Sequence, residues 1–76
     1  MEKHDYILME IKAEYEKAAK KFKPFNSPHE GHSVILEEMD ELWDEVKKQL
    51  PSNENMKKEA IQIAAMALRF VNDLLD

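Results

Sequence analysis

Six carboxylates occupy nine consecutive positions in the segment EEMDELWDE, residues 37–45. On a helix, Glu37, Glu38 and Glu41 would lie within about 100° of one face, where like charges repel by roughly 0.2–0.5 kcal/mol per pair. Neither this segment nor the nine residues before it contain a Lys or Arg that would relieve the repulsion. Carboxylate oxygens are ligands that Mg²⁺ prefers, and a bound metal would neutralise a polyphosphate and orient an attacking water. The segment is therefore either a metal site or the solvated face of an amphipathic helix, and helix geometry alone favours the solvated face.

A second pair of oxygen-bearing side chains, Glu59 and Gln62, lies one helical turn apart in a later, alanine-rich segment. Both border the wide apolar arc of the helix that this segment predicts. Packed against the acidic segment of the same or another subunit, Glu59 and Gln62 would complete a ring of oxygens. Convergence of the two segments would favour a metal site over a solvated face.

Three helices are expected to position these side chains. Apolar residues at alternating steps of three and four predict the first helix. Ser27 and Glu30 flank Pro28 as a capping box that starts the second helix, and Pro51 is expected to stop it. The Ser-Asn pair after Pro51 supplies a cap for the third helix, and the short loop makes the last two helices antiparallel neighbours. The predicted helices span residues 3–21, 28–50 and 54–75 of a single all-α domain.

The composition favours a helical chain that associates with itself. Its 76 residues form one small domain, and a domain of this size buries only roughly 60% of the surface that its unfolded chain exposes. One glycine argues against a β-fold with many tight turns. The absence of cysteine excludes disulfides and thiolate metal sites. We therefore expect a second copy to supply the missing core.

Charge and hydropathy restrict the partners and the compartment. A net charge of −5 repels the backbone of a nucleic-acid polymer. The N-terminal residues are charged throughout, unlike a signal peptide, and the most apolar stretch, residues 61–71, is about half the length that a bilayer requires. We expect a soluble, cytoplasmic protein without a membrane or nucleic-acid partner.

The two acidic segments together resemble the MazG-like all-α nucleoside triphosphate pyrophosphohydrolases, a family with the pattern E-E-x-x-E followed by E-x-x-D. This sequence has EEMDE at residues 37–41, EAIQ at residues 59–62 and then IAAMALRFVNDL, and the resemblance extends from Ser27 to Leu74. It implies hydrolysis between the α- and β-phosphates of a nucleotide, giving a monophosphate and pyrophosphate. It also implies homodimers or homotetramers in which helices of different subunits complete a four-helix bundle.

The resemblance also implies the site residues. Mg²⁺, with Mn²⁺ as a substitute, would be held by Glu37, Glu38, Glu41 and Glu59, and the first three would form the catalytic centre. Gln62 stands where the family has an aspartate and is a further candidate ligand. Because an amide ligates only through its carbonyl oxygen and has no charge, Gln62 would bind a metal more weakly than an aspartate.

Four further residues are candidates for contact with a substrate. His32 lies near a helix start, which attracts phosphate, although a solvated polar role is the alternative. Lys57 and Lys58 also lie near a helix start, where lysines do not complement the helix dipole. Arg69 would either meet the substrate or pair with an acidic residue across the bundle. Trp43 belongs to an apolar arc, so packing in the core or between subunits is favoured over stacking on a base.

Two other functions remain open for this sequence. The chain could be a non-catalytic helical module, structural or regulatory, with a similar fold. Alternatively, its acidic face could bind a basic protein, in which case binding would depend strongly on salt and not on a metal.

Overall fold

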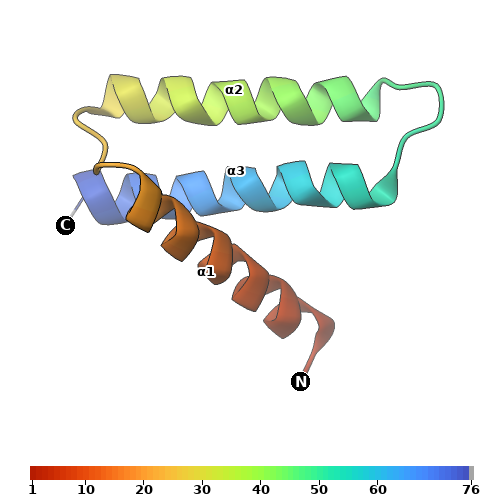
Figure 1. Ribbon diagram of the computed structural model, residues 1–76, viewed down its shortest axis with the longest axis horizontal. Helices are drawn as coiled ribbons and strands as arrows, with labels where there is room; N and C mark the ends of the chain where they lie inside the picture. The colour runs from red at the N-terminus through yellow and green to blue at the C-terminus, as the bar shows by residue number, and fades with distance from the viewer. Residues whose placement is uncertain (76) are drawn as a thin grey trace.

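The computed structural model describes residues 1–75 as three helices, with no strand among them. These are α1 (Lys3–Lys21), α2 (Pro28–Val46) and α3 (Asn53–Leu74), so the predicted all-α class is confirmed. Helices α2 and α3 form the predicted antiparallel hairpin, and α1 crosses α3 obliquely (Figure 1). Over the described residues, none of the helices is both long enough and apolar enough to span a bilayer.

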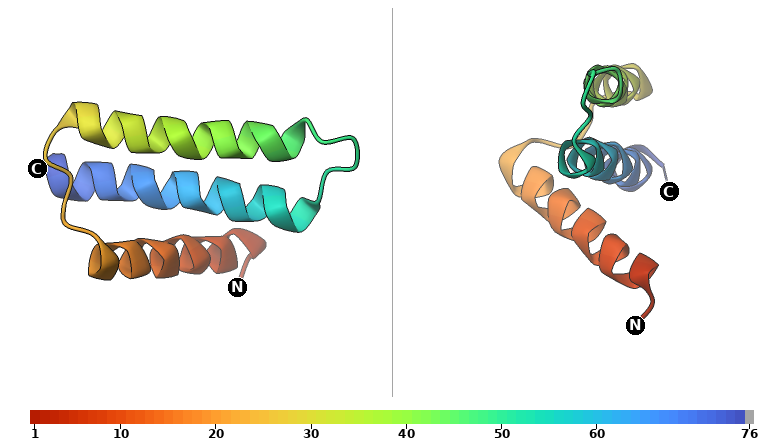
Figure 2. Two further views of the ribbon diagram at one scale, coloured as in Figure 1. Left: turned by 45° about the horizontal axis from the view of Figure 1, so that its top comes forward. Right: turned by 90° about the vertical axis from the view of Figure 1, so that its right-hand side faces the viewer.

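Helix α3 is the central element of the fold. Two further views show α2 and α1 on different sides of α3 (Figure 2). Among the described residues α3 packs against both helices, whereas α1 and α2 do not pack against each other. The wide apolar arc of the third helix predicts contact with at least two other helices, and this prediction is confirmed.

The helix starts are determined by local hydrogen bonds that the sequence largely predicts. Helix α1 has the predicted bounds. The Ser27 hydroxyl accepts from the Glu30 N–H at 3.1 Å, and Ser52 accepts from the Asn55 N–H at 3.2 Å. The reciprocal half of the predicted capping box is wrong, because the Glu30 carboxylate accepts from the Asn26 N–H at 3.0 Å. Glu30 therefore secures the incoming loop as well as the helix.

Helix α2 ends at Val46, four residues before the predicted end at residue 50. Pro51 has no N–H to donate to a carbonyl one turn earlier, and its ring disfavours helical geometry at Leu50. The last intrahelical bond at this end joins the Lys47 N–H to the Trp43 carbonyl at 3.0 Å. The proline therefore removes a whole helical turn, and the released residues form the connection to α3.

A small core lies where α1 and α2 meet α3. Its buried members are Ala18, Phe25, Ala65 and Met66, with Val34 and Phe70 among the partly buried side chains around it. Gly31 is buried where α2 approaches α3, and a Cβ at this position would lie 2.5 Å from Cδ2 of Phe70. The single glycine of the chain therefore permits the close packing of the helix hairpin.

The outer face of α2 is apolar and exposed. Its uncovered residues are Leu36, Met39, Trp43 and Val46, and Leu50 in the connection after the helix is also exposed. Trp43 is 59% exposed, so packing in the core of a single chain is excluded, while packing between subunits remains a prediction. This face of α2 is exposed because α1 packs against α3 and not against α2.

Candidate acidic site

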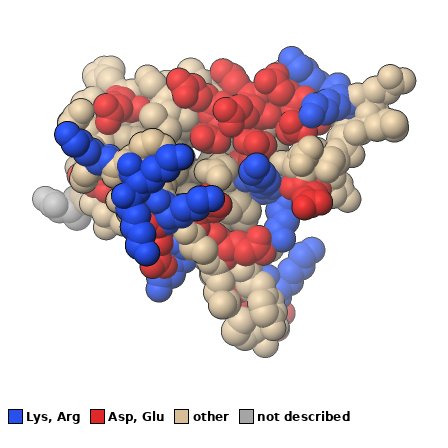
Figure 3. Space-filling model, viewed as in Figure 1, with Lys and Arg blue, Asp and Glu red and all other residues tan. Residues whose placement is uncertain are grey.

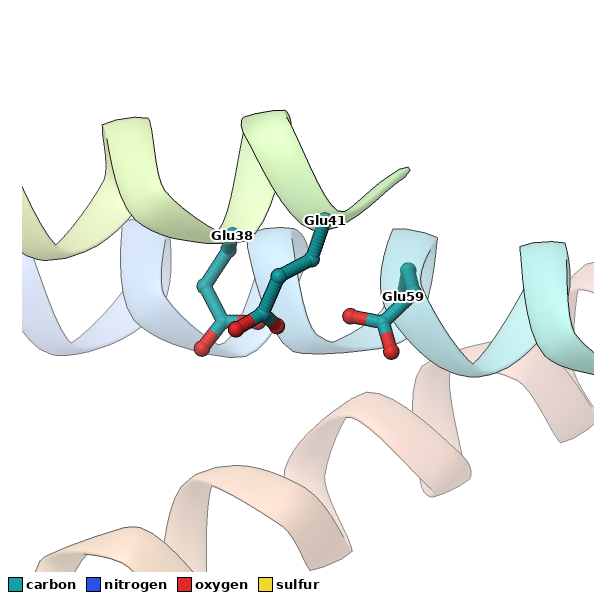
Figure 4. A group of neighbouring side chains, drawn as sticks. All are labelled: Glu38, Glu41 and Glu59. Carbon is teal, nitrogen blue, oxygen red and sulfur yellow. The ribbon is translucent and has the colours of Figure 1, made fainter. Parts of the chain in front are cut away.

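The structure brings three glutamates together from the two antiparallel helices. Glu38 and Glu41 extend from α2, and Glu59 points toward them from α3 (Figure 4). Each contributes one carboxylate oxygen to a group in which all oxygens lie within 4.8 Å of one another. We call these three residues the acidic triad.

The surroundings of Glu38 disfavour its ionised form. Its pKa is raised from 4.5 to about 7, first by burial and then by the charge of Glu41 and a hydrogen bond with it. The charges of Glu59 and Glu37 raise this pKa further. Glu38 is therefore about half protonated near neutral pH, in contrast to an ordinary surface glutamate.

Glu59 is in a similar position on α3. Burial and then the hydrogen bond and charge of Glu41 raise the pKa of Glu59, while Lys58 lowers it. Its Oε2 atom is buried and has no hydrogen-bond donor among the described residues. Two ionised carboxylates cannot hydrogen-bond to each other, so a shared proton, a cation or an ordered water would each satisfy this oxygen.

The acidic triad fits a hard divalent cation. All three donors are carboxylate oxygens, and Mg²⁺ takes about six oxygen ligands, several of them from water or phosphate. A divalent ion would offset the charge repulsion and satisfy the buried oxygen of Glu59 at the same time. The exposed carboxylate of Glu41 leaves one side of the triad accessible to solvent and ligands.

Two of the sequence-predicted ligands lie outside the triad. Glu37 is exposed and lines a cleft between α1 and α2. Gln62 lines the same cleft, and its Nε2 donates to Oε2 of Glu14, on α1, at 3.0 Å. The sequence offered no signal for Glu14, because the placement of α1 against α3 comes from the tertiary fold.

The predicted phosphate-contacting residues have separate surroundings. Lys57 forms an ion pair with Glu10 at 3.0 Å, which links α3 to α1. Lys58 lies close enough to Glu59 to lower its pKa. His32 is exposed in the second turn of α2, and its side chain forms no hydrogen bond with the other described residues. None of the three is a member of the triad.

Arg69 pairs with an acidic residue, which was one of the two expected alternatives, but that residue lies on the same helix and not across the bundle. Its guanidinium is buried 4.2 Å from the centre of the Phe25 ring and donates to the Lys23 carbonyl at 2.9 Å. It also lies 3.7 Å from the Asp73 carboxylate, which in turn accepts from the Phe25 N–H at 3.1 Å. Arg69 therefore secures the loop between α1 and α2, and its i,i+4 spacing from Asp73 was the available signal.

No model of a protein family, no curated protein and no solved structure matches this chain. A function for the chain is therefore inferred from the geometry of the acidic triad and from the sequence pattern that supplies its residues.

Proposed function

We propose that this chain is a Mg²⁺-dependent nucleotide pyrophosphohydrolase of the MazG-like type that its sequence resembles. It would cleave a nucleoside triphosphate to a monophosphate and pyrophosphate, and Mn²⁺ could replace Mg²⁺. The observation that supports this most strongly is the acidic triad, in which a buried oxygen of Glu59 has no donor. A surface helix of ordinary solvated glutamates would not bury such an atom.

The residues of the site divide into two roles in this proposal. Glu38, Glu41 and Glu59 hold the metal. When bound, the metal supplies electrostatic neutralisation of the phosphates and lowers the pKa of a water molecule. Glu37 lies outside the triad but beside Glu38, so its carboxylate is free to accept a proton from the attacking water.

The direct test compares Glu59→Gln with Asp40→Asn, a matched change of an exposed carboxylate on α2 outside the triad. Millimolar Mg²⁺ should raise the melting temperature of the wild type and of Asp40→Asn, but not that of Glu59→Gln. At a Mg²⁺ concentration ten times its Kd, the gain in stability is about 1.4 kcal/mol. Pyrophosphate release from a panel of canonical and modified triphosphates should show the same pattern. The proposal fails if Mg²⁺ leaves the wild-type melting curve unchanged and no triphosphate yields pyrophosphate.

A non-catalytic module, structural or regulatory, is the second candidate. It is favoured by Gln62, which stands where the family has an aspartate and whose amide is engaged by Glu14. This alternative predicts that Mg²⁺ stabilises the protein while no triphosphate is cleaved. Pyrophosphate release by the wild type excludes it.

The proposed enzyme acts in the cytoplasm as a homodimer or homotetramer with a four-helix bundle. The exposed residues on the outer face of α2 repeat at steps of three and four, which is the spacing of a helix–helix seam. Three further apolar residues on or just after α3 are also exposed: Leu68, Val71 and Leu75. Because the buried core of one chain contains few large side chains, a second copy of the hairpin would complete it.

A further inference from the structure

A cleft with walls of opposite charge lies beside the acidic triad. Its volume is about 740 Å³, within the usual range of small-molecule sites. Glu37 and Glu38 on α2 form one wall, while α1 contributes Lys17 and Lys21 to the other. Glu14 also lines the α1 wall, and its carboxylate accepts a hydrogen bond from Gln62. The floor includes Met66 of α3, and the loop between α1 and α2 closes one end. Glu38 belongs both to the triad and to this cleft, so a ligand here would lie next to the proposed metal.

Lys17 and Lys21, which we call the lysine wall, have no charge partner among the described residues. Lys17 and Lys21 are one turn apart on α1, where like charges repel, and Lys23 from the loop also lines the cleft. None of these three lysines forms an ion pair with any residue in the described part of the chain. Figure 3 shows basic side chains over the C-terminal half of α1, beside the acidic side chains gathered over α2. The opposed walls therefore face each other without direct contact between their charges.

We propose that this cleft binds the polyphosphate chain of the substrate, with Lys17 and Lys21 contacting phosphate oxygens. This inference rests on the proposed function and names the residues that would bind the phosphates. A polyphosphate with a divalent cation suits both walls, because its oxygens accept from lysine and its cation meets the carboxylates. A dianionic ligand without a cation would be repelled by Glu37 and Glu38.

The cleft also explains why other lysines are weaker candidates. Lys57 is already paired with Glu10, and neither Lys57 nor Lys58 lines this cleft. Lys12 and Lys20 lie on α1 outside the cleft and are exposed. They offer a control of equal charge on the same helix.

The test measures binding of inorganic tripolyphosphate by calorimetry, with and without excess Mg²⁺. The double variant Lys17→Gln/Lys21→Gln is compared with Lys12→Gln/Lys20→Gln, since glutamine preserves helix propensity. The cleft variant should bind tripolyphosphate at least about tenfold more weakly, because two charge-assisted contacts are lost. The control variant should stay within about twofold of the wild type, since surface changes away from a site have small effects. Both variants should keep the wild-type rise in melting temperature with Mg²⁺ alone.

The possible outcomes separate this inference from the proposed function. The proposed role of Lys17 and Lys21 is overturned if both double variants bind tripolyphosphate equally well, or if the wild type does not bind it. Either result counts whether or not Mg²⁺ binds. If tripolyphosphate binding depends on these lysines but Mg²⁺ does not change the melting temperature, the role of the lysines is supported and the metal site is rejected. In hydrolysis assays of the cleft variant, KM for a triphosphate should rise by a larger factor than kcat falls.

Discussion

The carboxylates of Glu41 on α2 and Glu59 on α3 face each other across the helix hairpin, and one oxygen of Glu59 is buried without a donor. Such carboxylates repel each other when both are ionised, so a proton or a cation between them would be stabilising. We therefore expect the stability of the protein to depend on pH and, if the proposed function holds, on metal.

Stability without metal should fall as the pH is raised from about 4.5 to about 7. The folded protein keeps a proton on Glu38, whose pKa is raised from 4.5 to about 7, while the unfolded chain loses it. The stabilising effect is thus complete below pH 4.5 and lost above pH 7. Urea denaturation of the wild type and of Glu38→Gln at several pH values, without divalent ions, measures it.

The comparison with Glu38→Gln reports the titration of Glu38 together with the neighbouring carboxylates coupled to it. Titrating residues elsewhere are common to both proteins and cancel. Glu45 does not contribute to the change in stability in this pH window. Lys48 lowers the pKa of Glu45, so Glu45 titrates below the window. Relative to the wild type, Glu38→Gln should gain stability as the pH rises through the window. A constant difference between the two proteins over this range would contradict the raised pKa.

Gly31→Ala should destabilise the protein by about 1–2 kcal/mol. A Cβ here would lie 2.5 Å from the Phe70 ring and 3.3 Å from the Phe25 ring, which would force the helices apart. This cost exceeds the helix-propensity gain of roughly 0.5–1 kcal/mol. The midpoint of urea unfolding measures the change, with the nearby exposed change Ser33→Ala as the control. A variant as stable as the wild type would show that Phe70 moves aside freely.

Arg69→Met should cost about 3 kcal/mol, because it leaves Asp73 buried without its charge partner. The double variant Arg69→Met/Asp73→Asn should be more stable than the single one, since an asparagine oxygen can still accept from the Phe25 N–H. Melting followed by circular dichroism compares both, with the exposed change Lys20→Met as the control. If Arg69→Met has the same melting temperature as the wild type, the guanidinium does not stabilise the loop.

Trp43→Asp should convert the proposed oligomer to a monomer. The side chain is 59% exposed in one chain, and a charge there would have to be buried in the subunit interface. Met9→Asp on α1 is the control, because Met9 is also 59% exposed. Analytical ultracentrifugation gives the mass of each variant, and Met9→Asp should keep the mass of the wild type. A monomeric wild type would remove the oligomer from the proposal.

The sequence by itself determined the helices and their chemistry. Alternating apolar steps, two serine caps and a proline are local signals, so α1 and the starts of α2 and α3 were predicted to within one residue. The acidic face of α2 follows from helical periodicity alone. The early end of α2 was missed because the prediction stopped the helix at Pro51 without removing the turn before it.

Only the tertiary structure decided which side chains meet. Glu59 reaches Glu38 and Glu41 because α2 packs on α3, and a helical wheel contains no information on such an approach. The lysines of α1 face α2 because α1 packs on α3, an arrangement of contacts between residues far apart in sequence. Periodicity determines the face of a helix on which a residue lies, but packing between helices determines what lies opposite that face.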